Sequence, residues 1–229
     1  FDKLNDIKEE AQKYKYWYYG PQKRFFQSVR LKNYFNNFAS DEAVFTAAYQ
    51  DIEESRHKQK NGDELLNNRT ESLQIIDFKT DFLKQFNHFK LNYGFDSRFQ
   101  KLNSTANLSN KNKLFYNTSR YPDGGTTVLN NALYLQANIE LSEKLSLLAG
   151  SRYSLNSLSA KFIDTTTIHL PFKEIQVENK SLSNSLQFVY NLNPNVELNA
   201  AISNGFRNPN TDDIGKVFSK NDIDVVIPN

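Results

Sequence analysis

Cysteine and methionine are both absent from the 229 residues of this chain. The absence of cysteine excludes disulfide frameworks, cysteine-ligated zinc sites, iron–sulfur clusters and thiol nucleophiles. Long hydrophobic runs are missing too, since no stretch approaches the roughly 18 to 20 apolar residues that a membrane-spanning helix needs. A helical membrane protein is therefore excluded. The chain opens on Phe1 without a secretory signal pattern, so we expect a fragment or a processed piece of a longer protein.

Neither sign of charge is in marked excess, because 28 basic and 26 acidic side chains leave a net charge of +2. Nucleic-acid-binding domains usually carry a strong basic excess on one face, so no nucleic-acid partner is expected. Enzyme signatures are missing as well: the sequence has no GxSxG, HExxH, P-loop or dinucleotide fingerprint. We therefore expect no enzymatic activity, no catalytic residues and no metal ion held by the protein itself.

The chain does contain an alternation of apolar and polar residues that is repeated many times. Only 38% of the residues are hydrophobic, yet the chain has 12 tyrosines and 18 phenylalanines. Such period-two alternation is typical of a strand with one apolar and one polar face. Between His88 and Gln100 one face would carry Phe89, Leu91, Tyr93, Phe95 and Phe99, and the other His88, Lys90, Asn92, Asp96, Arg98 and Gln100.

This pattern predicts eight strands, most of them long. A usual strand in a globular protein has about 5 to 6 residues, whereas a tilted strand needs roughly 9 to 11 residues to cross a bilayer. Outer-membrane barrels consist of segments of that length, apolar outside and polar inside. We therefore predict an all-β fold, a segment of an antiparallel up-and-down transmembrane β-barrel. The strands are expected at residues 23–35, 42–56, 69–86, 88–100, 131–141, 144–155, 182–192 and 196–204.

The connections between these segments alternate in length, as they do in outer-membrane barrels. Short connections are expected at 36–41, 87, 142–143 and 193–195, and long polar ones at 57–68, 102–128, 165–179 and from 205 onward. Before the first strand, Leu4, Ile7 and Ala11 are at roughly helical spacing. They predict a short helix, and the tyrosine-rich residues that follow it would complete another long outer loop.

Two other folds and functions share part of this pattern. A soluble β-sandwich binding module also alternates, but its strands are shorter and its turns lack the short–long rhythm. A passive porin-like channel would share the alternation and carry no plug. The first would be monomeric without detergent, and the second would conduct ions steadily in planar bilayers.

Three segments resemble the TonB-dependent outer-membrane receptors, most of all the haem, haemoglobin and iron-siderophore branch. They are Tyr16-Trp17-Tyr18-Tyr19-Gly20-Pro21-Gln22, Ala48-Tyr49-Gln50-Asp51-Ile52-Glu53-Glu54-Ser55-Arg56 and Ser203-Asn204-Gly205-Phe206-Arg207-Asn208-Pro209-Asn210. The motif Phe206, Arg207, Asn208 and Pro209 is similar to the FRAP box of haem receptors, with Asn208 where the family most often has alanine. Residues 212–218 and 225–229 look like the loop that leads into the family's NPNL box.

The resemblance implies a barrel of 22 strands closed around an N-terminal plug, of which residues 1–229 would be a partial barrel domain without plug or remaining strands. It implies a multi-pass protein of the bacterial outer membrane, surrounded by its lipid. It implies capture of haem or a ferric siderophore by outer loops, and import energised by the TonB complex, which would contact the missing N-terminal part. The plug and a haem-carrying protein are further partners. The cargo is a transported ligand, and no cofactor would be bound permanently.

Several side chains are candidates for contact with the cargo. His57 and His169 would lie at or in long loops and could ligate haem iron, although an exposed loop histidine is more often simply polar. Tyrosine is the other axial ligand, but tyrosines near strand ends usually form the interfacial aromatic girdle. The tyrosine candidates are Tyr16, Tyr18, Tyr19 and Tyr121.

Charged residues in the motif and on the polar strand faces are the last candidates. Arg207 offers a planar fork to a propionate or an acidic siderophore, while the alternative role of the motif is to end a strand, because proline removes a ladder donor. The polar strand faces should form hydrogen bonds and ion pairs facing the plug. Their charged members include Asp96, Arg98, Glu140 and Arg152.

Overall fold

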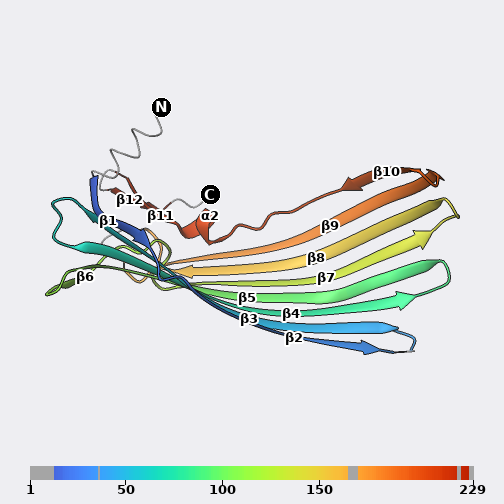
Figure 1. Ribbon diagram of the computed structural model, residues 1–229, viewed down its shortest axis with the longest axis horizontal. Helices are drawn as coiled ribbons and strands as arrows, with labels where there is room; N and C mark the ends of the chain where they lie inside the picture. The colour runs from blue at the N-terminus through green and yellow to red at the C-terminus, as the bar shows by residue number, and fades with distance from the viewer. Residues whose placement is uncertain (1–12, 36, 165–169, 221–222, 227–229) are drawn as a thin grey trace.

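The structure is a computed structural model that describes residues 13–35, 37–164, 170–220 and 223–226. One antiparallel sheet dominates it (Figure 1). The strands are β1 (Tyr14–Tyr19), β2 (Lys23–Tyr34), β3 (Glu42–Lys60), β4 (Leu66–Gln85), β5 (Phe89–Ser109), β6 (Leu114–Tyr116), β7 (Thr126–Glu140), β8 (Leu145–Lys161), β9 (Glu174–Asn193), β10 (Val196–Ser203), β11 (Val217–Lys220) and β12 (Ile223–Val226), and one short helix, α2, covers Thr211–Gly215. No helix among the described residues is long and apolar enough to cross a membrane.

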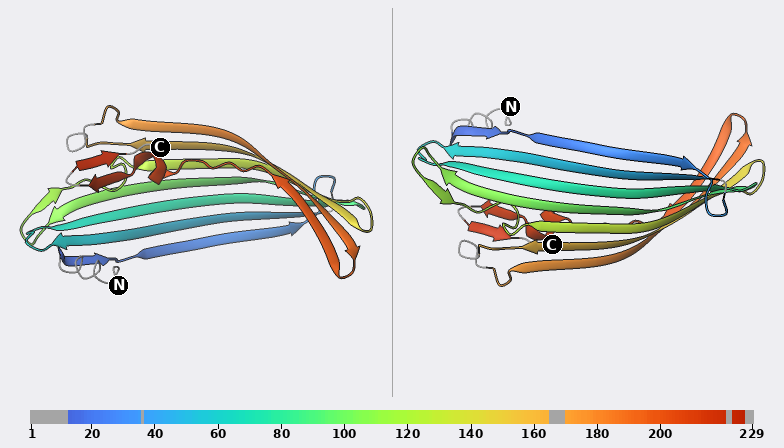
Figure 2. Two further views of the ribbon diagram at one scale, coloured as in Figure 1. Left: turned by 90° about the horizontal axis from the view of Figure 1, so that it is seen from above. Right: turned by 90° about the horizontal axis from the view of Figure 1, so that it is seen from below.

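All eight predicted segments are strands of this one sheet. Its order is β1-β3-β4-β5-β7-β8-β9-β10, with β2 paired to β3 and β6 to β5. Figure 2 shows the sheet from above and below as a long, curved and open surface. A sandwich needs two packed sheets. The soluble β-sandwich is therefore wrong as a fold, and the barrel-wall prediction agrees with the topology.

The register places apolar residues on one face of the sheet. Phe95 pairs with Leu133, Leu133 with Tyr153, and Tyr153 with Leu182, so one row of apolar side chains crosses four strands. The next row, from Asp96 through Ala132, Ser154 and Ser181, lies on the opposite face and is polar or small. The apolar outer belt remains exposed, as a lipid-facing surface requires. It includes Phe25, Val29, Leu31, Ile76, Phe78, Leu133, Leu135, Leu155, Leu186, Phe188 and Ile202.

The tyrosine-rich segment before β2 is a strand, so its prediction as part of a loop is wrong. Tyr14–Tyr19 forms β1, which pairs with the end of β3 while β2 pairs with the rest of it. Gly20, at φ +109°, separates β1 from β2, and its N–H donates to the Ser55 carbonyl at 2.9 Å. Ladder hydrogen bonds to β3 therefore fix a segment whose aromatic sequence has no clear alternation. The helix expected around Leu4, Ile7 and Ala11 lies outside the described residues.

The strands extend further at the long-loop end than the sequence predicts. β3 runs to Lys60 and β4 begins at Leu66. The long loop expected at 57–68 is therefore a turn of five residues around Gly62, whose φ is +90°. β5, β7, β8 and β9 lengthen in the same direction. The end of β3, from Arg56 to Lys60, is polar on both faces, so alternation ends there although the ladder hydrogen bonds to β4 continue. The tight turns occur where they were predicted, gathered at the right-hand end in Figure 1.

Candidate ligand-binding face of the barrel wall

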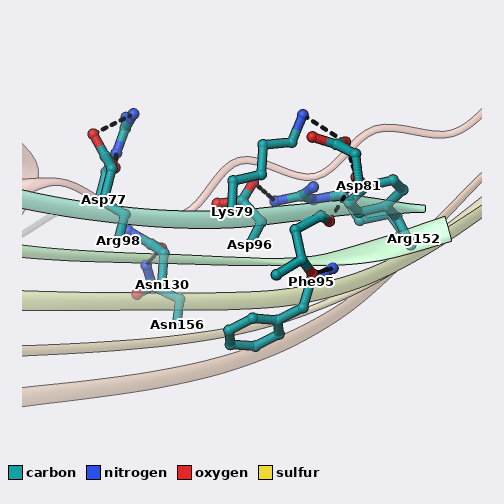
Figure 3. A network of polar contacts seen from close by, with 11 residues as sticks. Asp77, Lys79, Asp81, Phe95, Asp96, Arg98, Asn130, Arg152 and Asn156 are labelled. Atoms are coloured by element: carbon teal, nitrogen blue, oxygen red, sulfur yellow. Dashed lines mark hydrogen bonds and ion pairs between the residues drawn. The ribbon is translucent and has the colours of Figure 1, made fainter. Parts of the chain in front are cut away.

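The polar face of the sheet carries ion pairs that link neighbouring strands (Figure 3). Arg98 pairs with Asp77 at 2.5 Å, and Arg152 pairs with Asp96 at 2.9 Å. In Figure 3 these charged side chains lie on one side of the ribbon, whereas Phe95 points to the other. The sequence-based expectation of ion pairs for Asp96, Arg98 and Arg152 agrees with this geometry. Glu140 lies at the end of β7, beside a tight turn.

Two segments fold over this inner face at the long-loop end. One is the loop before β7, and the other is the stretch after β10 that carries α2, β11 and β12. Figure 2 shows α2 and the hairpin of β11 and β12 lying over the sheet rather than beyond its edge. Ile214 of α2 is only 3% exposed because it packs against Leu158 and Ala160 of β8. The loop before β7 joins this layer, since the Val217 N–H donates to the Arg120 carbonyl at 2.9 Å. Apolar contacts thus hold α2 against the wall, and a backbone hydrogen bond ties the loop before β7 to the same layer.

Arg207 of the FRAP-like motif is used in part to fix α2. Its Nη2 donates to both carboxylate oxygens of Asp213 at 2.7 Å. The Asn210 N–H also donates to Asp213, and the Asn210 side chain accepts from the Asp213 N–H, which forms a capping box. These hydrogen bonds, first from the Asn210 backbone and then from Arg207, lower the pKa of Asp213. The Arg207 side chain remains 76% exposed, so most of its guanidinium is open to a ligand.

The other residues of the motif lie in the extended segment between β10 and α2. β10 ends at Ser203, so Pro209 does not end that strand, and the alternative role of the motif is wrong in this respect. Phe206 is 50% exposed. The Asn208 Oδ1 is buried and has no hydrogen-bond partner among the described residues. An unpaired buried amide oxygen is costly.

Tyr121 joins the loop to the C-terminal segment. Its hydroxyl donates to Asp212 Oδ1 at 2.8 Å, and its backbone N–H donates to Ser104 Oγ of β5 at 3.3 Å. The ring lines a groove of about 190 Å³ between these segments and the wall. The groove floor is formed by Leu73, Gln100, Leu102, Thr126 and Val128, and its side by Asn210, Thr211 and Asp212. Tyr121 and Arg207 therefore belong to one docked layer on the inner face.

Docking of Tyr121 should depend on pH at the alkaline end. Burial and, second, the hydrogen bond to Asp212 raise the pKa of Tyr121 from its ordinary value of 10.0 to about 12. Since the protonated phenol is the docked form, its contribution is complete below pH 10 and is lost as the pH rises through about 12. The difference between the ultraviolet tyrosinate titrations of the wild type and Tyr121→Phe should be centred near pH 12.

Removal of the Asp212 charge should shift that titration downward, because the carboxylate disfavours a neighbouring phenolate. Asp212→Asn tests this expectation directly. Tyr34→Phe removes one exposed phenol from the far end of β2 and is the matched control. A Tyr121 difference curve centred near pH 10 would contradict the docked geometry.

His57 and the tyrosines of β1 lie apart from this layer. His57 is inside β3 rather than at a loop mouth, three residues before the strand ends, and alternation places it on the outer face. Its ring stacks on Tyr18 with centroids 4.6 Å apart, and its Nδ1 is 2.6 Å from Asn68 Oδ1. Tyr16 faces Gln59, whereas Tyr19 lies against the Arg56 guanidinium at 5.5 Å. His169 lies outside the described residues.

Glu71, at the long-loop end of the inner wall, was not among the residues predicted from the sequence. Glu71 of β4 is only 8% exposed and lies near Arg56, Arg69 and Arg120. The repeated pattern of Glu54 and Arg56 on one strand and Arg69 and Glu71 on the next was the available signal. Among the residues that the structure describes, no three His, Asp or Glu side chains are grouped to hold a metal ion.

Comparison with known proteins agrees with this architecture. A family model described as "TonB dependent receptor-like, beta-barrel" matches residues 3–228. A search of curated proteins finds no match. Among solved structures, the copper transporter OprC gives a TM-score of 0.67 at 11% identity, over 81% of this chain and 30% of that chain.

Two siderophore-related structures are also similar. The ferric yersiniabactin uptake receptor FyuA from Yersinia pestis gives a TM-score of 0.54 at 14% identity, over 76% of this chain and 27% of that chain. The siderophore receptor PiuA from Acinetobacter baumannii gives a TM-score of 0.56 at 13% identity, over 75% of this chain and 30% of that chain. The matches cover less than a third of each structure and show the fold alone.

The family match covers nearly the whole chain, and the strands, their register and the outer belt are those of an outer-membrane barrel wall. The family is one of receptors rather than enzymes, which agrees with the expected absence of enzymatic activity. The chain belongs to the TonB-dependent receptor family and forms part of its outer-membrane β-barrel.

Proposed function

We propose that the chain supplies eight strands of a larger plugged barrel that imports an iron chelate across the outer membrane, energised through TonB. The family match and the apolar outer belt support the transporter class. The observation that carries the proposal is the docked layer of loop 118–125 and α2, which folds inward over the polar wall and forms a groove.

A ferric siderophore fits this segment better than haem. Haem receptors use a histidine or a tyrosinate as axial ligand. His57 lies on the outer face with its ring hydrogen-bonded, and the pKa of Tyr121 is raised rather than lowered, so its phenolate form is disfavoured. A siderophore brings iron that is already coordinated and needs no protein ligand. The motif from Phe206 to Pro209 keeps haem as the second candidate.

Copper is the third metal to consider, since OprC carries the description of a copper transporter. Thioether and thiolate sulfurs are the ligands that select Cu(I). This segment contains neither methionine nor cysteine, so it would give Cu(I) no sulfur ligand. The cargo proposed for the groove is therefore a preformed chelate and not a bare ion.

The proposal is tested with the intact receptor purified in detergent. Haemin should give no Soret shift, whereas a ferric siderophore should quench tryptophan fluorescence with saturation. The planar-bilayer current should remain low, since a plug would close the barrel. A saturating Soret shift that is lost in Tyr121→Phe would instead assign haem, and a steady open-channel current would assign a passive pore.

A further inference from the structure

The last long strand of the sheet is covered by its neighbour over only part of its length. β10 pairs with β9 between Asn193 and Ser185, and no strand among the described residues lies beyond residues 174–184 of β9. Leu182, inside this open stretch, continues the apolar row that contains Leu133 and Tyr153, so it lies at the level of the lipid. Unpaired backbone groups are costly in lipid. The open edge of β9 therefore needs a partner strand.

The chain that follows β10 runs elsewhere in this structure. Residues 204–210, here called the strap, leave β9 and cross over the inner face to α2 (Figures 1 and 2). One side chain stops the ladder at this point. The Asn184 N–H donates to Asn204 Oδ1 at 2.6 Å, and Asn204 Nδ2 donates to the Leu182 carbonyl at 3.0 Å. The Asn204 amide thus occupies the two groups that would otherwise bond the backbone of Asn204 and Phe206.

The register that β10 has begun fits the strap onto the open edge. The Asn204 N–H donates to the Asn184 carbonyl at 3.1 Å, so the continued antiparallel register would pair Phe206 with Leu182. Phe206 is 50% exposed in its present position. Beside Leu182 it would extend the apolar row by one more strand, and Arg207 would face the polar lumen.

The proline of the strap is compatible with this pairing. Backbone groups that point towards β9 belong to alternate residues, namely Asn204, Phe206 and Asn208. Pro209 falls at the next position, where the missing N–H would point away from β9. A Cβ at Gly205 meets no atom within 4 Å, so no packed contact at this residue holds the strap in its present position.

α2 lies at the height that this pairing requires. In the continued register Thr211, where α2 begins, is level with Val177 of β9. Val177 packs against the cluster of Ile214 and Leu158 that holds α2 on the wall. The strap can therefore shift sideways onto β9 while α2 keeps its place.

We propose that the strap has two positions, one over the inner face and one in which it extends β10 along β9, and that the Asn204 amide is the stop between them. In the first position the strap covers part of the inner wall. In the second it leaves that part open and closes the lipid-facing edge of β9. The inference concerns the wall itself and goes beyond the proposed import of a chelate, on which it does not depend.

Pairs of introduced cysteines in the intact receptor, reconstituted in lipid vesicles, test the second position. This segment has no native cysteine, so a disulfide mapped within it by mass spectrometry identifies the introduced pair. Pro209→Cys with Asn179→Cys reports the extended strand, because the two residues would form a non-hydrogen-bonded pair with Cα atoms about 4.5 Å apart. Ala201→Cys with Gln187→Cys is the reference pair inside the existing ladder.

The 209–179 pair should cross-link more slowly than the reference pair. Asn204→Ala should speed it about tenfold, because the two hydrogen bonds of the stop are lost. Asn199→Ala is the matched control, since the Asn199 amide bonds the side chains of Gln187 and Glu197 and no backbone group; it should leave the rate unchanged. Hydrogen exchange without introduced cysteines is the second readout, and the Lys180 amide should become better protected in Asn204→Ala.

Two results overturn the inference. If the 209–179 disulfide is absent in both backgrounds while the reference pair forms, the strap does not reach β9. If it forms as fast as the reference pair and Asn204→Ala has no effect, the strap is a permanent strand without a stop. Both results leave the proposed function intact, because that function is measured by chelate binding.

Discussion

Leu135→Arg is expected to destabilise the folded barrel by about 2–4 kcal/mol, the cost of arginine at the bilayer midplane on a lipid-facing strand position. Leu135 lies near the middle of the apolar belt on β7, between Tyr93 and Ser151, and is 49% exposed. No neighbouring carboxylate lies on that face to pair with the new charge among the described residues. The guanidinium would have to reach the lipid headgroups or thin the bilayer around it.

The measurement is reversible urea unfolding of the intact receptor in lipid vesicles, followed by tryptophan fluorescence. Gln136→Arg is the matched control, because Gln136 is the next residue along the strand and faces the opposite, polar side. It should cost less than about 1 kcal/mol, since a lumen-facing substitution does not place charge in lipid. Equal losses from the two variants would contradict the assignment of the faces.

Gly94→Ala is expected to cost about 1–3 kcal/mol or more, the range for forcing additional volume into a packed position. A Cβ at residue 94 would lie inside van der Waals contact of the Thr80 carbonyl oxygen and 2.5 Å from the Tyr134 hydroxyl. Tyr134 crosses over Gly94 from β7 and donates to the Thr80 carbonyl at 3.2 Å and to the Asp81 carboxylate. The missing side chain of Gly94 thus lets one tyrosine tie β7 to β4 across β5.

The same vesicle unfolding assay measures this effect. Gly205→Ala is the control, because a Cβ at that position meets no atom within 4 Å. Combining Gly94→Ala with Tyr134→Ala should recover only part of the loss, since the clash with the Thr80 backbone remains. Full recovery in the double variant would show that the tyrosine alone sets the requirement for glycine, and an unchanged stability of Gly94→Ala would contradict the packing altogether.

The eight strands could be predicted from the sequence because lipid and lumen impose opposite demands on successive residues. Alternation alone places Phe95 and Leu133 on the apolar face and Asp96 on the polar face, whereas the structure shows that Phe95 pairs with Leu133. The prediction missed strand residues in the expected loops, and two of these places show that the demand is absent there. β3 continues through His57 although both faces are polar there, and Tyr14–Tyr19 is a strand although it is aromatic on both faces.

The candidate site was predictable only in part. Tyr121 and Arg207 were singled out by residue type, and the structure places both in the docked layer, whereas it places His57 on the other face. The alternating charges around Glu71 were visible in the sequence, but nothing local indicated that Glu71 would be buried rather than exposed to the lumen. Its burial depends on a loop that follows β5 and folds back over the wall.

The sequence by itself determined that this chain forms long strands with one apolar and one polar face, since a period of two reports which face of the sheet each residue occupies. Only the tertiary structure decided which residues of distant segments contact one another. Leu158 packs against Ile214, and the Tyr121 N–H donates to Ser104 Oγ, through contacts between segments apart in the chain. Such contacts leave no periodic trace, because they depend on loop closure and docking rather than on local alternation.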